Sequence, residues 1–123
     1  MNSGDNIIKK KGFAFAVRIV NLYKVLSTER KEFVMSKQLL RSGTSVGGNI
    51  REAVNAQSKP DFIHKLAISK KECDETIYWL ELLKETGYTT DIEFESMNTD
   101  AIELLKIIRS IIMSSKKNII HNS

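Results

Sequence analysis

Residues 31–57 read KEFVMSKQLLRSGTSVGGNIREAVNAQ, and the number of helices in the chain depends on whether this stretch is continuous. Apolar and small residues recur along it every three or four positions, as on one face of a helix: Met35, Leu39, Ser42, Val46, Asn49, Ala53 and Ala56. Gly43, Gly47 and Gly48 each disfavour a helix by about 1 kcal/mol relative to alanine. The stretch is therefore either broken near residue 47 or one continuous helix whose glycines let a neighbour approach closely. The spacing keeps its phase across the glycines, which favours the continuous helix.

The segment before it carries two apolar stripes side by side. Phe13, Ala16, Val20 and Tyr23 form one stripe, and Phe15, Ile19, Leu22 and Leu26 form the other. The core of a helical bundle needs only one such stripe per helix. We therefore expect the stripe of Phe15, Ile19, Leu22 and Leu26 to be the interface with other copies of the chain.

Two further helical segments follow, and both have clear ends. Ser58 with Asp61, and Thr90 with Glu93, have the spacing of capping boxes that begin a helix. Gly87 is placed to end the third helix in a left-handed conformation. The fourth segment loses its periodicity after Ser114, which predicts a frayed tail.

Four helices of matched length, about 24–28 residues each, with short connections predict an all-α, antiparallel up-down four-helix bundle. Residues 1–123 are expected to form one domain, with an ordered core at about 5–115 and a flexible C-terminal tail. The single cysteine, Cys73, fits a reducing compartment. Arg18 interrupts the one apolar run that follows a lysine cluster, and no run is long enough to cross a membrane. We expect a cytoplasmic protein.

Charge is distributed unevenly along the chain. Residues 1–71 hold 14 basic and 5 acidic residues (net +9), residues 72–103 hold 1 and 10 (net −9), and residues 104–123 hold 4 and none (net +4). Antiparallel packing should gather one set of cations at one tip: Lys9, Lys10, Lys11, Arg51, Lys59, Lys65, Lys116 and Lys117. The other tip should receive an acidic set: Glu81, Glu85, Asp91, Glu93 and Glu95. A clustered basic surface is typical of proteins that contact the nucleic-acid backbone.

Few residues point to catalysis. The only histidines are His64 and His121, and the chain lacks a Glu-x-x-His motif, a Cys/His cluster and the lysine of a phosphate-binding loop. We expect neither enzymatic activity nor a metal or other cofactor. His64 is interpreted as a surface residue and Cys73 as an inert buried thiol.

A polar stripe also runs along the second helix: Gln38, Arg41, Ser45, Asn49 and Glu52. One interpretation is a hydrogen-bond network that fixes helix register or a subunit contact, with Arg41 or Arg51 pairing with Glu52. The other is a polar groove that receives a ligand. The structural role is favoured, because buried polar groups must satisfy one another.

Residues 38–53, QLLRSGTSVGGNIREA, followed by Ser58-Lys59-Pro60-Asp61-Phe62, resemble the signature of the four helix bundle protein family. This family is related to small proteins encoded in intervening sequences of bacterial 23S rRNA genes. The resemblance extends over about residues 12–114, including Glu75 and the corner at Thr86-Gly87-Tyr88. Family members more often have Ala-Glu-Gly where this chain has Arg51-Glu52-Ala53, so Arg51 either enlarges the basic tip or pairs with Glu52.

The resemblance implies a homopentameric ring of antiparallel bundles. It also implies a role that some relatives have as accessory proteins of diversity-generating retroelements, in which a basic ring contacts a reverse transcriptase and nucleic acid. The leading hypothesis is a non-catalytic oligomeric binding protein that contacts RNA or DNA through the basic tip with low sequence specificity. The alternative is a protein-interaction scaffold or accessory subunit that does not contact nucleic acid directly.

Overall fold

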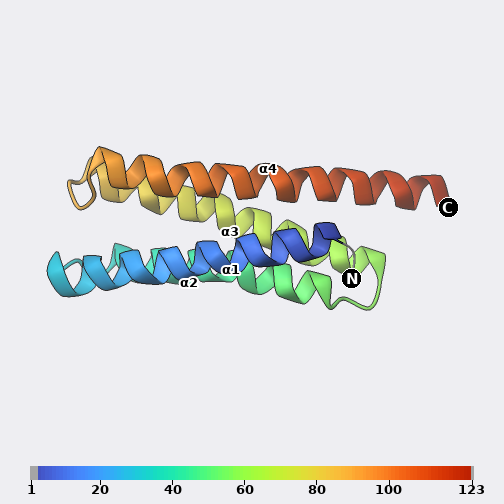
Figure 1. Ribbon diagram of the computed structural model, residues 1–123, viewed down its shortest axis with the longest axis horizontal. Helices are drawn as coiled ribbons and strands as arrows, with labels where there is room; N and C mark the ends of the chain where they lie inside the picture. Colours follow the sequence, from blue (N-terminus) through green and yellow to red (C-terminus); the bar gives the residue numbers. More distant parts are fainter. Residues whose placement is uncertain (1–2, 123) are drawn as a thin grey trace.

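The computed structural model describes residues 3–122, and they form an antiparallel four-helix bundle (Figure 1). The helices are α1 (Ser3–Lys24), α2 (Met35–Val54), α3 (Lys59–Glu85) and α4 (Asp91–Asn122), and a π-helical turn, η1 (Val25–Glu29), extends α1. No strand occurs within residues 3–122. The predicted all-α, up-down fold is confirmed.

The helix order fixes which parts of the chain share an end of the bundle. The start of α1, the end of α4 and the α2–α3 connection lie at one end of the bundle, which we call the terminal end (Figure 1). The α1–α2 and α3–α4 connections lie at the opposite end, which we call the distal end. Residues that are distant in sequence therefore meet at each end.

Close approach of α1 explains two of the three glycines of α2, which is one continuous helix. A β-carbon on Gly47 would lie 2.7 Å from the carbonyl oxygen of Gly12, and one on Gly43 would lie 2.7 Å from two side-chain carbons of Ile19. Gly12 is restricted from the other side of the same contact, because its β-carbon would lie 2.9 Å from the end of the Ile50 side chain and 3.2 Å from the α-carbon of Gly47. The continuous helix and the close neighbour are both confirmed.

Small hydroxyl residues join α2 to α3 on the opposite side of α2. Thr76 Oγ1 donates a hydrogen bond to Ser42 Oγ at 3.0 Å, and Ser69 Oγ donates to the carbonyl oxygen of Val46 at 2.8 Å. All three hydroxyl side chains are buried. Buried hydroxyls need partners, so these bonds favour one register of the two helices.

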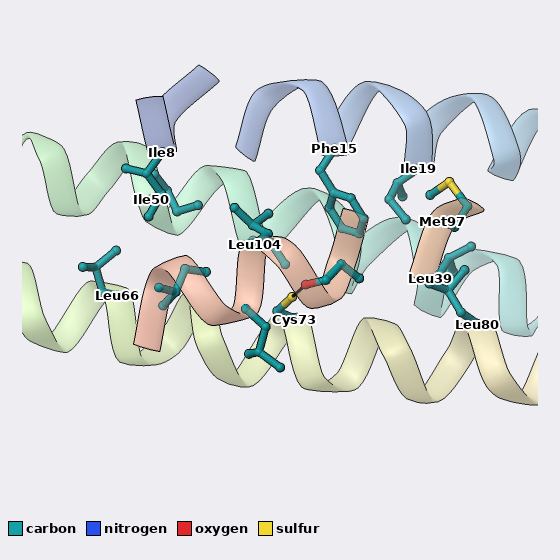
Figure 2. Close-up of a cluster of buried hydrophobic side chains, with 14 of the residues drawn as sticks. Ile8, Phe15, Ile19, Leu39, Ile50, Leu66, Cys73, Leu80, Met97 and Leu104 are labelled. Carbon is teal, nitrogen blue, oxygen red and sulfur yellow. Dashed lines mark hydrogen bonds between the residues drawn. The ribbon is translucent and has the colours of Figure 1, made fainter. Parts of the chain in front are cut away.

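The hydrophobic core draws on all four helices, as Figure 2 shows for Ile8, Phe15 and Ile19 on α1 facing Leu39, Leu66 and Leu104 on the other three. The predicted oligomer interface is wrong, because Phe15, Ile19 and Leu26 are buried in this core and Leu22 packs against it. The other stripe of α1 faces outward instead. Its Phe13 is 59% exposed, and Val17 beside it is 44% exposed.

Three helix ends match the predicted capping residues. Ser58 Oγ accepts a hydrogen bond from the backbone N–H of Asp61, and Thr90 and Glu93 bond each other's backbone N–H groups reciprocally. Gly87 has φ +82°, and the next residue, Tyr88, donates its N–H to the carbonyl oxygen of Leu83. These local side-chain and backbone bonds fix the α3–α4 corner.

The start of α2 lies at Met35 rather than at Lys31. The Glu32 carboxylate accepts hydrogen bonds from the backbone N–H groups of Val34, Met35 and Ser36, at 3.0, 2.9 and 2.6 Å. Burial raises the pKa of Glu32, but the three backbone donors outweigh it and the pKa is lowered. Glu32 therefore caps the helix from outside it, and α2 also ends earlier than predicted, at Val54.

The end of α4 lies beyond the predicted one. The helix continues past Ser114 to Asn122 and reaches beyond the other helices at the terminal end (Figure 1). Residues 114–122 contain neither glycine nor proline, so no residue stops the helix. Ser115 is still buried in this stretch, whereas residues 116–118 are exposed.

The glycine contact gives a prediction about stability. Gly47→Ala should lower the free energy of unfolding by about 1–3 kcal/mol, because the added methyl group would overlap the Gly12 carbonyl. Gly48→Ala is the matched control, since nothing lies within 4 Å of a β-carbon there. It should stabilise the chain by up to about 1 kcal/mol through helix propensity alone. Urea unfolding measures both, and equal effects would contradict the close approach.

Candidate nucleic-acid interface

The fold gathers the predicted basic residues from four helices at the terminal end. Lys9, Lys10 and Lys11 lie early in α1, and Arg51 lies in the last turn of α2. Lys59 and Lys65 begin α3, while Lys116 and Lys117 lie near the end of α4. Antiparallel order brings these four stretches to the same end (Figure 1).

The gathered cations differ in their surroundings. Lys11 Nζ lies 2.5 Å from Glu103 Oε1, and the Arg51 guanidinium lies 5.8 Å from the centre of the Phe13 ring. The remaining six form no ion pair within residues 3–122: Lys9, Lys10, Lys59, Lys65, Lys116 and Lys117. The positive charges of these six lysines therefore have no ion-pair partner in the described part of the chain.

Acidic residues of α4 are engaged by α1 and its connection to α2. Besides the contact of Lys11 with Glu103, Arg18 binds Asp100 at 2.5 Å and Arg30 binds Glu93 at 2.7 Å. We call this row of three ion pairs the α1–α4 seam. With the ion pairs of Glu72, Glu75 and Asp91, six of the ten acids of residues 72–103 are paired within the part of the chain that the structure describes.

The distal end is less acidic than predicted. It holds Glu81, Glu85, Asp91, Glu93 and Glu95, but the α1–α2 connection brings Arg30 to the same place. Arg30 donates to both carboxylate oxygens of Glu93, at 3.0 and 2.7 Å, and to the carbonyl oxygen of Tyr88 at 2.7 Å. The contrast between the two ends is thus smaller than the chain segments suggest.

Sequence reasoning missed four cations that lie away from the helix ends: Lys70, Lys71, Lys106 and Arg109. Lys70 and Lys71 on α3, with Arg109 and the predicted Lys116 on α4, line a groove of about 570 Å³ between these helices. Lys106 lies in an adjoining hollow on α4 with Arg109 and Lys117. The available signal was the helical spacing of residues 106, 109, 113 and 116.

The polar stripe of α2 connects that helix to α3. Arg41 binds Glu72 at 3.2 Å and also binds Glu75, which in turn accepts a hydrogen bond from Trp79 Nε1 at 3.1 Å. The Arg41 and Trp79 contacts lower the pKa of Glu75, Trp79 contributing most. The predicted pairing of Glu52 with an arginine is wrong, because Arg41 pairs with α3 instead and Arg51 stacks on Phe13.

Other members of the stripe bond within α2. Ser45 Oγ donates to the carbonyl oxygen of Arg41 at 2.6 Å, and Asn49 Nδ2 donates to that of Ser45 at 2.9 Å. Gln38 and Glu52 are exposed. The stripe is therefore ion-paired to α3 at Arg41, hydrogen-bonded within α2 at Ser45 and Asn49, and exposed to solvent at its two end residues.

His64 and Cys73 lie in different surroundings. His64 is exposed on α3, and the side chain of His121 lies outside the described residues. Burial raises the pKa of Cys73 to about 12, and its Sγ donates to the carbonyl oxygen of Ala101 at 3.3 Å. Within the described part of the chain, no three His, Cys, Asp or Glu residues are placed to hold a metal ion, and no helix is long and apolar enough to cross a membrane.

Comparison with known proteins gives consistent matches in sequence and in fold. The model of the 23S rRNA-intervening sequence protein family matches residues 4–110. The fold is similar to a crystal structure from Bacteroides thetaiotaomicron, a protein of unknown function from the S23 ribosomal protein family, with a TM-score of 0.88. The two sequences are 61% identical over 89% of this chain and 98% of that one. No curated protein matches the chain significantly.

The contact between Arg30 and Glu93 predicts a loss of stability in acid. Hydrogen bonds from Arg30 and from the backbone of Thr90 lower the pKa of Glu93 from 4.5 to about 2. As the pH falls, the unfolded chain takes up this proton before the folded chain does. The stabilisation is therefore complete above about pH 4.5 and is lost as the pH falls toward 2.

Glu93→Gln should lower the Tm at neutral pH and have a much smaller effect near pH 2, as followed by circular dichroism. Glu95→Gln removes an exposed carboxylate that has no ion pair in residues 3–122, and it should change the Tm little at either pH. A loss of the same size in both variants would show that the Arg30 contact is not its cause.

Proposed function

The chain belongs to the 23S rRNA-intervening sequence protein family, and we propose that it is a non-catalytic, homo-oligomeric protein that binds RNA or DNA through its terminal end. The observation that carries this proposal is the set of six lysines there, drawn from α1, α3 and α4, that have no ion pair within residues 3–122. Lysine is a compact point charge that meets phosphate without reading bases. Low sequence specificity follows.

The outward face of α1 supports self-association. Phe13 and Val17 are exposed there, next to Gly48 on α2, whose surroundings are open. Together with Ala16 and Thr44, Phe13 and Gly48 line a shallow hollow between the two helices. The proposed interface therefore moves from the buried stripe of α1 to the exposed side chains of Phe13 and Val17. The family resemblance implies five copies.

A second candidate function is a protein-interaction scaffold or accessory subunit that does not contact nucleic acid, such as a partner of a reverse transcriptase. The distal end favours it, because Phe33, Val34 and Ile92 are 53%, 75% and 83% exposed there. Exposed apolar side chains near one another are typical of protein-binding surfaces. The two candidates place their contacts at opposite ends of the bundle and can be tested separately.

Nucleic-acid binding is tested with a matched pair of double variants. Wild-type affinity for mixed RNA in filter binding should fall steeply between about 50 and 200 mM salt. Lys10→Glu with Lys117→Glu at the terminal end should weaken binding strongly. Lys24→Glu with Lys37→Glu makes the same change in net charge outside that end and should have little effect.

Equal losses in the two double variants, or no wild-type binding at low salt, would contradict contact through the terminal end. The scaffold alternative predicts a different pattern. Phe33→Ser with Val34→Ser would release a protein partner that co-purifies from the native cell and leave RNA retention unchanged.

Self-association is tested at the exposed face of α1. Wild-type protein should exceed the monomer mass in native mass spectrometry at micromolar concentration. Val17→Glu should yield a folded monomer, because it places a charge in the proposed apolar contact. Tyr78→Glu alters a side chain of similar exposure on α3 and should leave the assembly intact. A monomeric wild-type protein would remove the oligomer from the proposal.

A further inference from the structure

The groove between α3 and α4 is lined mainly by basic residues. Lys70 and Lys71 line it from α3, and Arg109, Met113 and Lys116 line it from α4. Its only acidic lining residue is Asp74. None of its four cations forms an ion pair within residues 3–122.

We propose that the α3–α4 groove is the track along which a nucleic-acid strand lays its sugar–phosphate backbone, with Lys70, Lys71, Arg109 and Lys116 contacting its phosphates. This inference rests on the nucleic-acid binding proposed above and specifies where on the bundle the strand binds. It extends the contact from the terminal end along the side of the bundle.

The spacing of the cations on α4 suits a polymer. Lys106, Arg109, Met113 and Lys116 are separated by three, four and three residues, so they form one stripe with about one turn, 5.4 Å, between successive members. Lys70 and Lys71 face this stripe across the groove. Because Lys116 and Lys117 also belong to the basic set at the terminal end, the groove and that end form one continuous positive surface.

The two faces of α4 have opposite charge. Asp100 and Glu103 point toward α1, where Arg18 and Lys11 neutralise them. The groove face carries Arg109 and Lys116 instead, and Asp74 of α3 is the one acidic residue that lines the groove with them. A row of cations without ion-pair partners attracts a polyanion such as a nucleic-acid strand and steers it along the row.

The remaining groove residues suit a strand better than a small free anion. Met113 is 61% exposed and offers an apolar surface to sugars or bases. Arg109 is exposed, and its planar guanidinium can bind phosphate with two donors or stack on a base. Lys71 and Lys116 are exposed as well, so the groove is open along its length rather than closed around one ligand.

The experiment compares two quadruple variants by fluorescence anisotropy with a short labelled oligouridylate over a salt series. The groove variant carries Lys70→Gln, Lys71→Gln, Arg109→Gln and Lys116→Gln. The matched control removes the same charge outside the groove and the terminal end with Lys24→Gln, Lys31→Gln, Lys37→Gln and Lys84→Gln. Circular dichroism confirms that both variants keep the wild-type helicity.

The groove variant should bind at least about tenfold more weakly than the control, and the slope of log affinity against log salt should shrink by about 0.7 for each lost phosphate contact. If the control loses as much as the groove variant or more, the track is overturned, while nucleic-acid binding itself stands. If the wild-type chain does not bind the probe at low salt, the track and the proposed function both fail.

A site-specific readout removes dependence on net charge. Met113→Cys, labelled with a benzophenone maleimide, should cross-link to the bound oligouridylate. Ile92→Cys, at an exposed position on the distal end, should not. Buried Cys73 does not compete for the label. Equal cross-linking from both positions, or cross-linking from residue 92 alone, would overturn the track.

Discussion

Backbone contact between α1 and α2 is the constraint on which the rest of the bundle depends. Gly47 meets the carbonyl of Gly12, so at that point the two helices are separated by little more than their own main chains. This contact turns Phe15 and Ile19 into the core and leaves Phe13 facing outward. On its other side α2 presents Ser42 to Thr76, again with small side chains. The second helix is thus the centre on which its two neighbours are positioned.

Ion pairs contribute to this molecule in a different way from its packing. Exposed ion pairs contribute little to stability individually, about 0.2–1 kcal/mol each. Their larger effect here is to determine which charged side chains stay without a neutralising partner. In the seam, carboxylates of α4 neutralise Lys11, Arg18 and Arg30. A carboxylate of α3, that of Glu72, neutralises Arg41 in the same way. Lysines near the α2–α3 connection and along the second half of α4 form no such pair within residues 3–122.

Local features of the fold were predictable from the sequence, and non-local ones were not. Capping by Ser58 and Thr90 and the left-handed Gly87 depend on neighbouring residues, so their spacing was sufficient. The start of α2 depends on Glu32, a residue outside the helix that its periodicity does not mark.

The two stripes of α1 have the same helical periodicity, although the stripe of Ile19, Leu22 and Leu26 is the more apolar. Packing of α1 against α2 and α4 buries that stripe and leaves Phe13 exposed. The basic residues at the helix ends follow from antiparallel order alone. The groove cations do not, because Lys70 and Arg109 lie within their helices and become neighbours only through the register of α3 against α4.

The α1–α4 seam makes one side of the bundle respond to ionic strength. Packing between α1 and α4 is sparser than between the other neighbouring helices, and its ion pairs lie at the surface, where mobile ions screen them. Local opening of the fold should therefore begin along this side, with α1 still held to α2 by the glycine contact. The same rise in salt that releases a polyanion from the lysines also loosens the bundle where α1 meets α4.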